Sequence, residues 1–218
     1  MKRALAALVA LGALAALAAC EPIKPPPPQP PPSRGAVIMY GDSLLGESRA
    51  YVQSTTQLRG LGGSALCDSL EDIVTAAATE RPRLIVVEFV GNNLTTCMSG
   101  YTTPAQITAK YAADAAELKL RVDVPILWVG PPLFRSGPPP TWGLFDAESR
   151  FVDAGQAVLE NGAYTDTLPC LPDEGPARGC ANGRIAVRAA DGAHFGTSAP
   201  GYSSGARRFA DAMDAAVG

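Results

Sequence analysis

Three residues of this chain have the types and the spacing that acyl transfer requires. Ser43 follows a Gly-Asp pair at the end of an apolar run over residues 36–40. A serine hydroxyl is a weak nucleophile at neutral pH and needs a base to take its proton. His194 is the only histidine in the chain, and Asp191 precedes it by three residues in a glycine-containing loop, where the carboxylate can orient the imidazole. Taken singly, Ser43 is equally well a helix cap and His194 a structural residue, but together they predict a Ser-His-Asp unit.

A unit of this kind must also stabilise the negative oxygen that develops on the attacked carbonyl. The candidate donors are the backbone N–H groups of Gly62 and Gly63, in the turn "RGLGGSALCD", and the side-chain amide of Asn92, which follows an apolar run. Each has a simpler interpretation, because glycines form turns and asparagine caps helices. The chain therefore offers an oxyanion site without requiring one.

The elements that would position these residues alternate between strands and helices. Apolar runs predict buried strands at 36–40, 83–90 and 124–130, with weaker strands at 56–61 and 184–189. Helical patterns predict helices at 67–79, 104–121, 144–160 and 201–217. Such alternation indicates a parallel sheet covered on both faces. Ligands of such sheets bind beyond the carboxyl ends of the strands, and Ser43 and Asn92 would both lie there.

The four segments, in the order Gly-Asp-Ser, glycine-rich turn, Gly-Asn-Asn and Asp-x-x-His, resemble the SGNH hydrolase superfamily (GDSL esterases and lipases) over about residues 36–205. The resemblance implies an α/β fold, a three-layer α/β/α sandwich with a central parallel sheet of about five strands, of the flavodoxin-like SGNH hydrolase type. It also implies an acyl-serine mechanism without metal or cofactor, in which Ser43 is the nucleophile, His194 the base and Asp191 the residue that orients the base.

The resemblance also assigns the oxyanion hole. Its donors would be the backbone N–H groups of Ser43 and Gly63, with Gly62 as the alternative glycine, and the side-chain amide of Asn92. The third segment reads Val-Gly-Asn-Asn, where the family usually has Gly-x-Asn-Asp. This departure leaves Asn93 as an alternative to Asn92.

Composition limits the classes of protein to which the chain can belong. Its 218 residues are 47% hydrophobic and 18% charged, with a net charge of −3, as expected for one globular domain of ordinary size. The sequence has no cluster of basic residues, so a nucleic-acid partner is not expected. We expect a monomeric domain over residues 35–218.

The first 34 residues are expected to export and tether this domain. A basic start followed by an apolar stretch is typical of a signal peptide over 1–19. It ends in Leu-Ala-Ala-Cys, which is similar to the bacterial lipobox, so Cys20 would carry lipid; a plain signal peptide is the alternative. The proline-rich residues 20–34 would form an extended linker. These features predict an exported cell-membrane lipoprotein that faces the extracytoplasmic side.

The cysteine count agrees with export. Five cysteines are present, and lipidation of Cys20 would leave four to form disulfides in an oxidising compartment. Of the three possible pairings we favour Cys67–Cys97 and Cys170–Cys180, the second because it closes a short loop rich in proline and glycine. Zinc binding is the rival hypothesis, but the chain has no CxxC spacing and a single histidine.

These observations predict a serine esterase of the cell envelope that acts on an ester of a small molecule, a glycan or a lipid. An O-acyltransferase acting on an envelope glycan would use the same residues. A lipoprotein that keeps the fold and only binds its ligand is the third hypothesis. Three aromatic residues in segment 130–146 are candidates either for the substrate pocket or for the core: Phe134, Trp142 and Phe145.

Overall fold

The computed structural model describes residues 35–54, 57–60 and 62–218, which are built around a five-stranded parallel sheet. The predicted signal peptide, Cys20 and the linker lie outside the described residues. The strand order is β2-β1-β3-β4-β5. The strands are β1 Val37–Gly41, β2 Gln57–Gly60, β3 Leu84–Glu88, β4 Ile126–Val129 and β5 Phe151–Val152. No helix in the described part of the chain has both the length and the apolar character needed to cross a bilayer.

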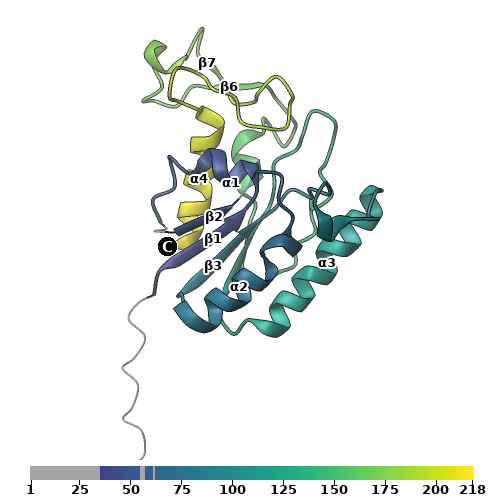
Figure 1. Ribbon diagram of the computed structural model, residues 1–218. Helices are drawn as coiled ribbons and strands as arrows, with labels where there is room; N and C mark the ends of the chain where they lie inside the picture. Colours follow the sequence, from purple (N-terminus) through teal and green to yellow (C-terminus); the bar gives the residue numbers. More distant parts are fainter. Residues whose placement is uncertain (1–34, 55–56, 61) are drawn as a thin grey trace, which may run out of the picture. The chain divides into compact units, whose positions relative to one another are not determined.

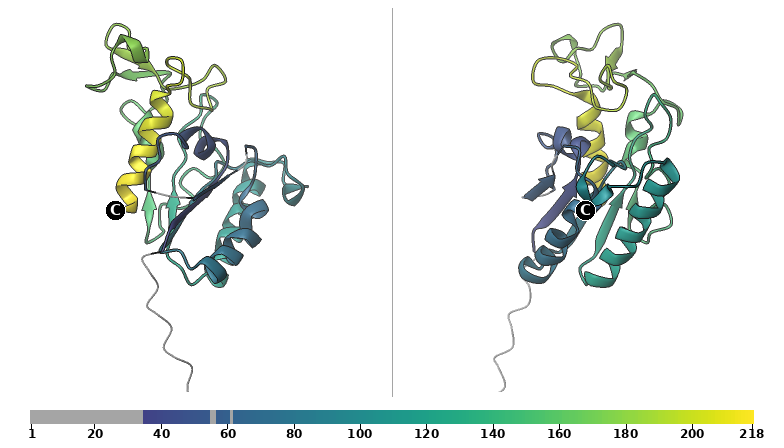
Figure 2. Two further views of the ribbon diagram at one scale, coloured as in Figure 1. Left: turned by 60° about the vertical axis from the view of Figure 1, so that its left-hand side comes forward. Right: turned by 45° about the vertical axis from the view of Figure 1, so that its right-hand side comes forward.

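Helices cover both faces of this sheet (Figures 1 and 2). They are α1 Ser43–Ser48, α2 Leu66–Glu80, α3 Pro104–Arg121 and α4 Ser204–Val217. Successive side chains of a strand point to opposite faces, so Ile38 and Tyr40 of β1 pack in the layer of α2 and α3. Val37 and Met39 pack in the layer of α1 and α4. The expected three-layer parallel α/β/α sandwich is confirmed.

Local sequence signals mark the residues at which the longer helices begin. The Thr103 hydroxyl accepts the N–H of Gln106 at 3.3 Å, and the Gln106 side chain accepts the N–H of Thr103 at 3.1 Å. This capping box encloses Pro104, a residue suited to the first helical position of α3. The predicted helices at 67–79, 104–121 and 201–217 are confirmed as α2, α3 and α4.

The helix predicted at 144–160 is wrong. The segment contains β5 and the short 3₁₀ helix η2 Ala154–Val158. The sheet edge holds this backbone, because the N–H of Gly130 donates to the carbonyl of Val152 at 2.8 Å. A Cβ atom on Gly155 would collide with the carbonyl of Pro131, so glycine permits a close approach here. Pairing with β4 overrides the helical pattern of the local sequence.

The strand predicted at 184–189 exists in part but lies outside the parallel sheet. It is β7 Arg184–Ala186, which pairs antiparallel with β6 Thr167–Pro169. Both strands belong to a loop-rich lobe, residues 160–203, at the end of the sheet to which the strand arrows point (Figure 1). The 3₁₀ helix η3 Pro176–Arg178 lies in the same lobe.

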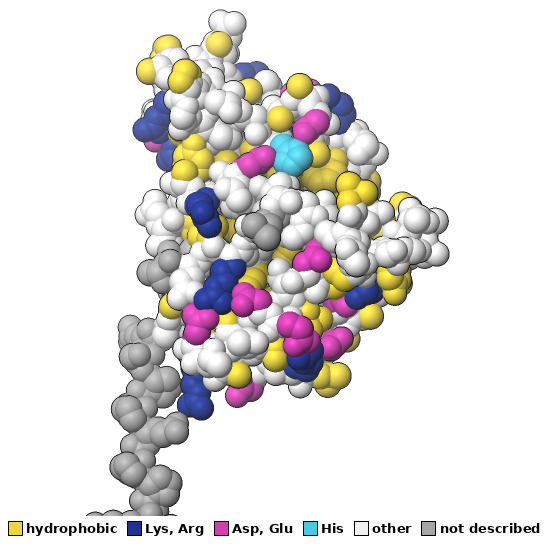
Figure 3. Space-filling model, viewed as in Figure 1, with side chains coloured by type: hydrophobic (Ala, Val, Ile, Leu, Met, Phe, Trp, Pro, Cys, Tyr) yellow, Lys and Arg dark blue, Asp and Glu magenta, His cyan; other side chains and the backbone are white. Residues whose placement is uncertain are grey.

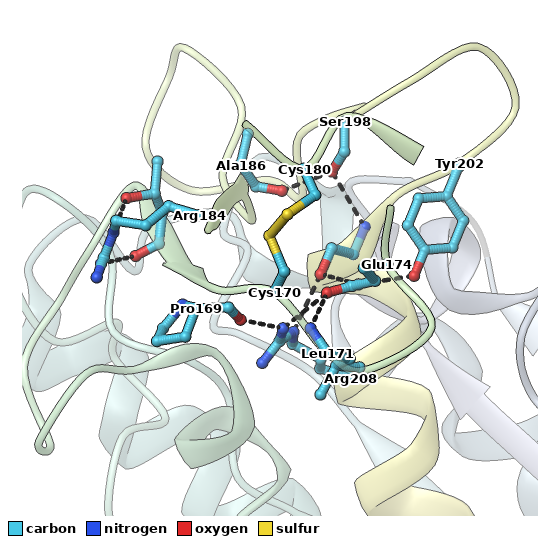
Figure 4. The surroundings of a disulfide bond; sticks show 12 residues. Pro169, Cys170, Leu171, Glu174, Cys180, Arg184, Ala186, Ser198, Tyr202 and Arg208 are labelled. Atoms are coloured by element: carbon cyan, nitrogen blue, oxygen red, sulfur yellow. Dashed lines mark hydrogen bonds and ion pairs between the residues drawn. A yellow bond between two sulfur atoms is a disulfide. The ribbon is translucent and has the colours of Figure 1, made fainter. Parts of the chain in front are cut away.

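A buried carboxylate fastens this lobe to α4 (Figure 4). Glu174 accepts hydrogen bonds from the hydroxyls of Tyr202 at 2.7 Å and Ser204 at 2.6 Å, and from the guanidinium of Arg208 at 3.0 Å. The disulfide Cys170–Cys180 lies beside this cluster and closes the loop that carries Glu174. The lobe is therefore anchored to the helix that follows the His194 loop.

Both predicted disulfides are confirmed. Cys67–Cys97 joins residues 30 apart in sequence, and Cys170–Cys180 joins residues 10 apart. Cys67 lies in the first turn of α2, just after the glycine turn, and Cys97 lies in the 3₁₀ helix η1 Thr96–Met98, which follows Asn92. The first disulfide therefore ties together the two segments that carry the candidate oxyanion donors.

Candidate active site

The structure brings Ser43, His194 and Asp191 into one hydrogen-bonded row. The Nε2 atom of His194 lies 2.9 Å from Ser43 Oγ, and Nδ1 lies 2.6 Å from Asp191 Oδ2. The other Asp191 oxygen accepts the backbone N–H groups of Ala193 at 2.9 Å and His194 at 3.1 Å. The Asp-x-x-His loop thus orients its own imidazole, as its spacing predicted. The histidine side chain, 41% exposed, lies at the surface beside acidic side chains (Figure 3).

The turn that presents Ser43 depends on glycine and aspartate. A Cβ atom on Gly41 would lie 2.6 Å from the carbonyl oxygen of Glu88, so only glycine fits between β1 and β3 at this point. Asp42 is fully buried and caps α1, because its Oδ1 accepts the N–H of Leu44 at 3.1 Å. Ser43 is therefore the first residue of a helix at the carboxyl end of β1.

Asp42 also connects residues 41–43, named the nucleophile turn after the predicted role of Ser43, to the Asn92 loop, and the sequence did not predict this role. Its Oδ2 accepts the N–H of Val90 at 2.9 Å and the side-chain amide of Asn92 at 3.0 Å. Burial raises the pKa of Asp42 to about 6, although the hydrogen bonds from Val90 and Leu44 oppose the rise. The position of this aspartate, directly before a helix, was the sequence signal for its capping role.

Of the two adjacent asparagines, Asn92 is the one at the nucleophile turn. Its amide nitrogen donates to Asp42 and, at 3.1 Å, to the carbonyl of Ser64. Asn93 instead donates to the carbonyl of Tyr101 at 3.1 Å. Both N–H bonds of the Asn92 amide are engaged, so donation to an oxyanion requires one of them, on Asp42 or Ser64, to be exchanged.

The two candidate glycines lie in the turn between β2 and α2. A Cβ atom on Gly62 would be 4.0 Å from the Cβ of Ser43, which places this backbone beside Ser43. Gly63 has a φ of +79°, and a Cβ atom there would meet no heavy atom within 4 Å. A left-handed backbone at Gly63 favours glycine, and both glycines stay candidates for the backbone donor.

Burial and the neighbouring carboxylates have opposite effects on the pKa of His194. Burial lowers the pKa of the imidazole, but the hydrogen bond to Asp191 and the negative charges of Glu47, Asp191 and Asp42 outweigh burial and raise it above 6.5. The pKa of Asp191 falls to about 2, chiefly because of its hydrogen bond with His194 and also because of the N–H of Ala193. Asp191 is therefore ionised at any pH at which His194 titrates.

Two arginines donate hydrogen bonds to backbone carbonyls of the His194 loop. Arg188, which is buried, donates to the carbonyls of Ala193 at 3.3 Å and Leu133 at 3.0 Å. Arg135 donates to the carbonyl of Ala190 at 2.8 Å. Burial lowers the pKa of Arg188 to about 10, so this guanidinium stays charged at neutral pH. These contacts hold the loop backbone on both sides of Asp191.

A second buried acid, Glu88, lies at the end of β3 and was also missed. It is fully buried, and among the described residues neither of its carboxyl oxygens accepts a hydrogen bond of good geometry. Burial raises its pKa well above 4.5, and the charge of Asp42 adds to the rise. Its only sequence signal was a glutamate inside an otherwise apolar strand.

The aromatic candidates for the pocket separate into core and partly buried residues. Phe145 is core, because it is 3% exposed and its ring stacks on Trp128 with centroids 4.5 Å apart. Of the two alternatives for Phe145, the core is therefore the correct one and the substrate pocket is not. Phe134 and Trp142 are half-buried, so both remain candidates. Within the described residues, no group of three or more His, Cys, Asp or Glu side chains could hold a metal ion.

A cavity of about 460 Å³ borders the glycine turn. Gly60 and Ser64, which flank the turn, belong to its wall. The guanidinium of Arg59, also in the wall, donates to the Tyr40 hydroxyl at 2.9 Å and to Glu80 at 2.6 Å. The charge of this arginine is therefore compensated within the protein.

Comparison with known proteins shows likeness in structure. The sequence matches no protein-family model and no curated protein. A GDSL-like lipase from Bacteroides thetaiotaomicron is 13% identical, with a TM-score of 0.52 over 87% of this chain and 90% of that chain. The catalytic domain of peptidoglycan O-acetyltransferase A from Streptococcus pneumoniae is 14% identical, with a TM-score of 0.51 over 84% and 92% of the respective chains. The chain thus has the fold of the SGNH hydrolase superfamily, as its four segments implied.

Proposed function

We propose that this chain is a serine esterase that hydrolyses acyl esters through an acyl-serine intermediate. The observation that carries the proposal is the row of hydrogen bonds from Asp191 through His194 to Ser43, at 2.6 and 2.9 Å. Ser43 Oγ attacks the carbonyl carbon of the ester while its proton passes to His194 Nε2. Asp191, which remains ionised, stabilises the imidazolium that forms.

The remaining steps use the same residues in reverse roles. The imidazolium gives its proton to the alcohol oxygen as the acyl–oxygen bond breaks, which leaves the acyl group on Ser43. Water then attacks the acyl group and gives its proton to His194, which passes it to Ser43 Oγ as the acyl–Oγ bond breaks and the free acid leaves. The N–H groups of Ser43 and of Gly63 or Gly62, with the amide of Asn92, serve as donors to the oxyanion.

A fluorophosphonate probe tests this proposal, because it reacts with an activated serine beside an oxyanion site. We expect covalent labelling at Ser43, none in Ser43→Ala, and almost none in His194→Ala. Asp191→Asn should lower the rate by about 10⁴, since it favours the wrong imidazole tautomer. The chain holds no second histidine, so strong labelling of Ser43 in His194→Ala would contradict the scheme.

Transfer to a glycan hydroxyl is the second candidate function. It is favoured by the similarity to the catalytic domain of peptidoglycan O-acetyltransferase A. In that reaction an acceptor hydroxyl replaces water in the attack on acyl-Ser43. Incubation with an acyl donor, with and without a glycan acceptor, separates the two reactions. Hydrolysis predicts free acid at the same rate in both samples, whereas transfer predicts an acylated glycan and a faster turnover with acceptor. A binding lipoprotein would give neither product.

We also propose that the enzyme is exported and anchored by lipid on Cys20. The two disulfides of the domain support an oxidising compartment. Cys20→Ala should move the protein from the membrane fraction to the soluble fraction or block its maturation. Wild-type protein that is soluble and carries an unmodified cysteine would refute the anchor.

A further inference from the structure

Glu47 joins the nucleophile helix to the His194 loop. It lies four residues after Ser43 in α1, so both residues are on the same side of this short helix. One of its carboxylate oxygens, Oε2, accepts the backbone N–H of Phe195 at 2.8 Å. Phe195 directly follows His194, is 6% exposed and packs against Phe209 of α4, with ring centroids 5.3 Å apart. The bond therefore links the segment that carries the nucleophile to the segment that carries the base.

The charges facing His194 come from two segments. Asp191 belongs to its own loop, whereas Asp42 and Glu47 belong to the nucleophile turn and α1. The charge of Arg188 also interacts with those of Glu47 and Asp191. Burial lowers the pKa of His194, but the Asp191 hydrogen bond and then the charge of Glu47 raise it. Glu47 is thus a negative charge that acts on the imidazole from α1, outside the loop that carries His194.

We propose that Glu47 is a positioning residue for His194, holding the backbone beside the base one helical turn from Ser43 and stabilising the imidazolium by its charge. The inference rests on the proposed function for its catalytic meaning. No proton moves to Glu47: the proton of Ser43 passes to His194 Nε2, and the carboxylates of Asp191 and Glu47 both stabilise the new positive charge.

Two substitutions of Glu47 separate the effect of its charge from the effect of its hydrogen bond to Phe195. Glu47→Gln keeps a side-chain oxygen that can accept the Phe195 N–H but removes the charge. Glu47→Ala removes both. Glu71→Gln is the matched control, because it removes one negative charge from α2, where Glu71 binds Arg121. Since His194 is the only histidine, its imidazole C–H resonance in protein purified without a histidine tag reports a single titration.

We expect the His194 titration and the pH of half-maximal Ser43 labelling to shift to lower pH together in Glu47→Gln. Glu47→Ala should show the same shift and also a loss of about tenfold in the labelling rate at high pH, where every imidazole is neutral. Glu71→Gln should match wild type in both measurements. Circular dichroism and tryptophan fluorescence check that each variant is folded.

Titration curves of wild type and Glu47→Gln that superimpose would overturn the electrostatic part of the proposal. An unchanged plateau rate in folded Glu47→Ala would overturn the positioning part. Failure of the proposed function gives a different pattern, since wild-type Ser43 would then not be labelled. The resonance of His194 would still report whether Glu47 acts on the imidazole.

Discussion

Replacing Glu88 by glutamine should stabilise the protein increasingly as the pH rises. Glu88 is the last residue of β3 and is fully buried against the nucleophile turn. Among the described residues, no group forms a hydrogen bond of good geometry with its carboxyl oxygens. Burial and the charge of Asp42 raise its pKa well above 4.5, while the N–H groups of Asp42 and Leu45 offset only part of the rise. We therefore expect Glu88 to carry its proton in the folded state at neutral pH.

The magnitude follows from proton linkage. In the unfolded chain this carboxyl ionises near its ordinary pKa of 4.5, whereas the folded protein retains the proton. Above that pH the unfolded state binds fewer protons than the folded state, so the free energy of unfolding falls by about 1.4 kcal/mol per pH unit. The loss stops when the pH passes the raised folded-state pKa. Glutamine is a neutral side chain of nearly the same shape and has no such dependence.

Asp42 does not disturb the comparison. Its pKa, raised by burial to about 6, gives wild type and variant the same decline in stability between about pH 4 and 6. A protonated Glu88 has no charge with which to act on Asp42. The difference in unfolding free energy between Glu88→Gln and wild type should therefore be small at pH 4.5 and grow with the stated slope.

Urea denaturation followed by tryptophan fluorescence from pH 4.5 to 8, with the disulfides intact, measures this difference. Glu117→Gln is the control, because Glu117 is an exposed acid paired with Arg121; its effect should stay within about 1 kcal/mol at every pH. A pH-independent difference for Glu88→Gln would refute the reasoning. So would a variant that becomes less stable than wild type as the pH rises, since that requires an ionised and partnered Glu88.

Four other results are expected. The labelling rate of Ser43 should rise with pH through a midpoint above about 6.5, because Ser43 reacts only when His194 is neutral. Burial lowers the pKa of His194, but Asp191 and the neighbouring carboxylates raise it by more. A midpoint below 6 would contradict this order of effects. Asn92→Ala should slow turnover by about 10²–10³, whereas Asn93→Ala, whose amide points to another loop, should change it little. Replacing both cysteines of Cys67–Cys97 by serine should lower the unfolding free energy by about 3–4 kcal/mol, as expected for a loop of this length, and thermal denaturation would show it. Gly41→Ala should lower the melting temperature, with a cost of about 1–3 kcal/mol, because the new Cβ would lie 2.6 Å from a carbonyl oxygen of β3; an unchanged melting temperature would show that the strands separate easily.

Several features of the site could be predicted because they are local in the chain. The Asp191–His194 pair spans three residues, so its spacing alone brings the carboxylate to the imidazole. Ser43 follows an apolar run that is buried on both faces, which places it at the rim of a parallel sheet. The Cys170–Cys180 pairing could be inferred from its short loop. Each of these depends on neighbouring residues and on a repeating pattern of burial.

The features that could not be predicted depend on partners far away in sequence. Phe151–Val152 form a strand only because the edge of β4 is there to pair with them, against the helical pattern of their own segment. Asp42 accepts hydrogen bonds from Val90 and Asn92, which lie 48 and 50 residues away in sequence. Glu47 accepts one from Phe195, which lies 148 residues away.

The sequence by itself determined which residue types are present for acyl transfer, the order in which they occur and the layered fold that gathers them. Only the tertiary structure decided that Asn92 rather than Asn93 reaches the nucleophile turn, and that buried acids surround it. The physical reason is that hydrogen bonds and charges act over a few ångströms, and distances of that size between remote segments exist only after the chain has packed.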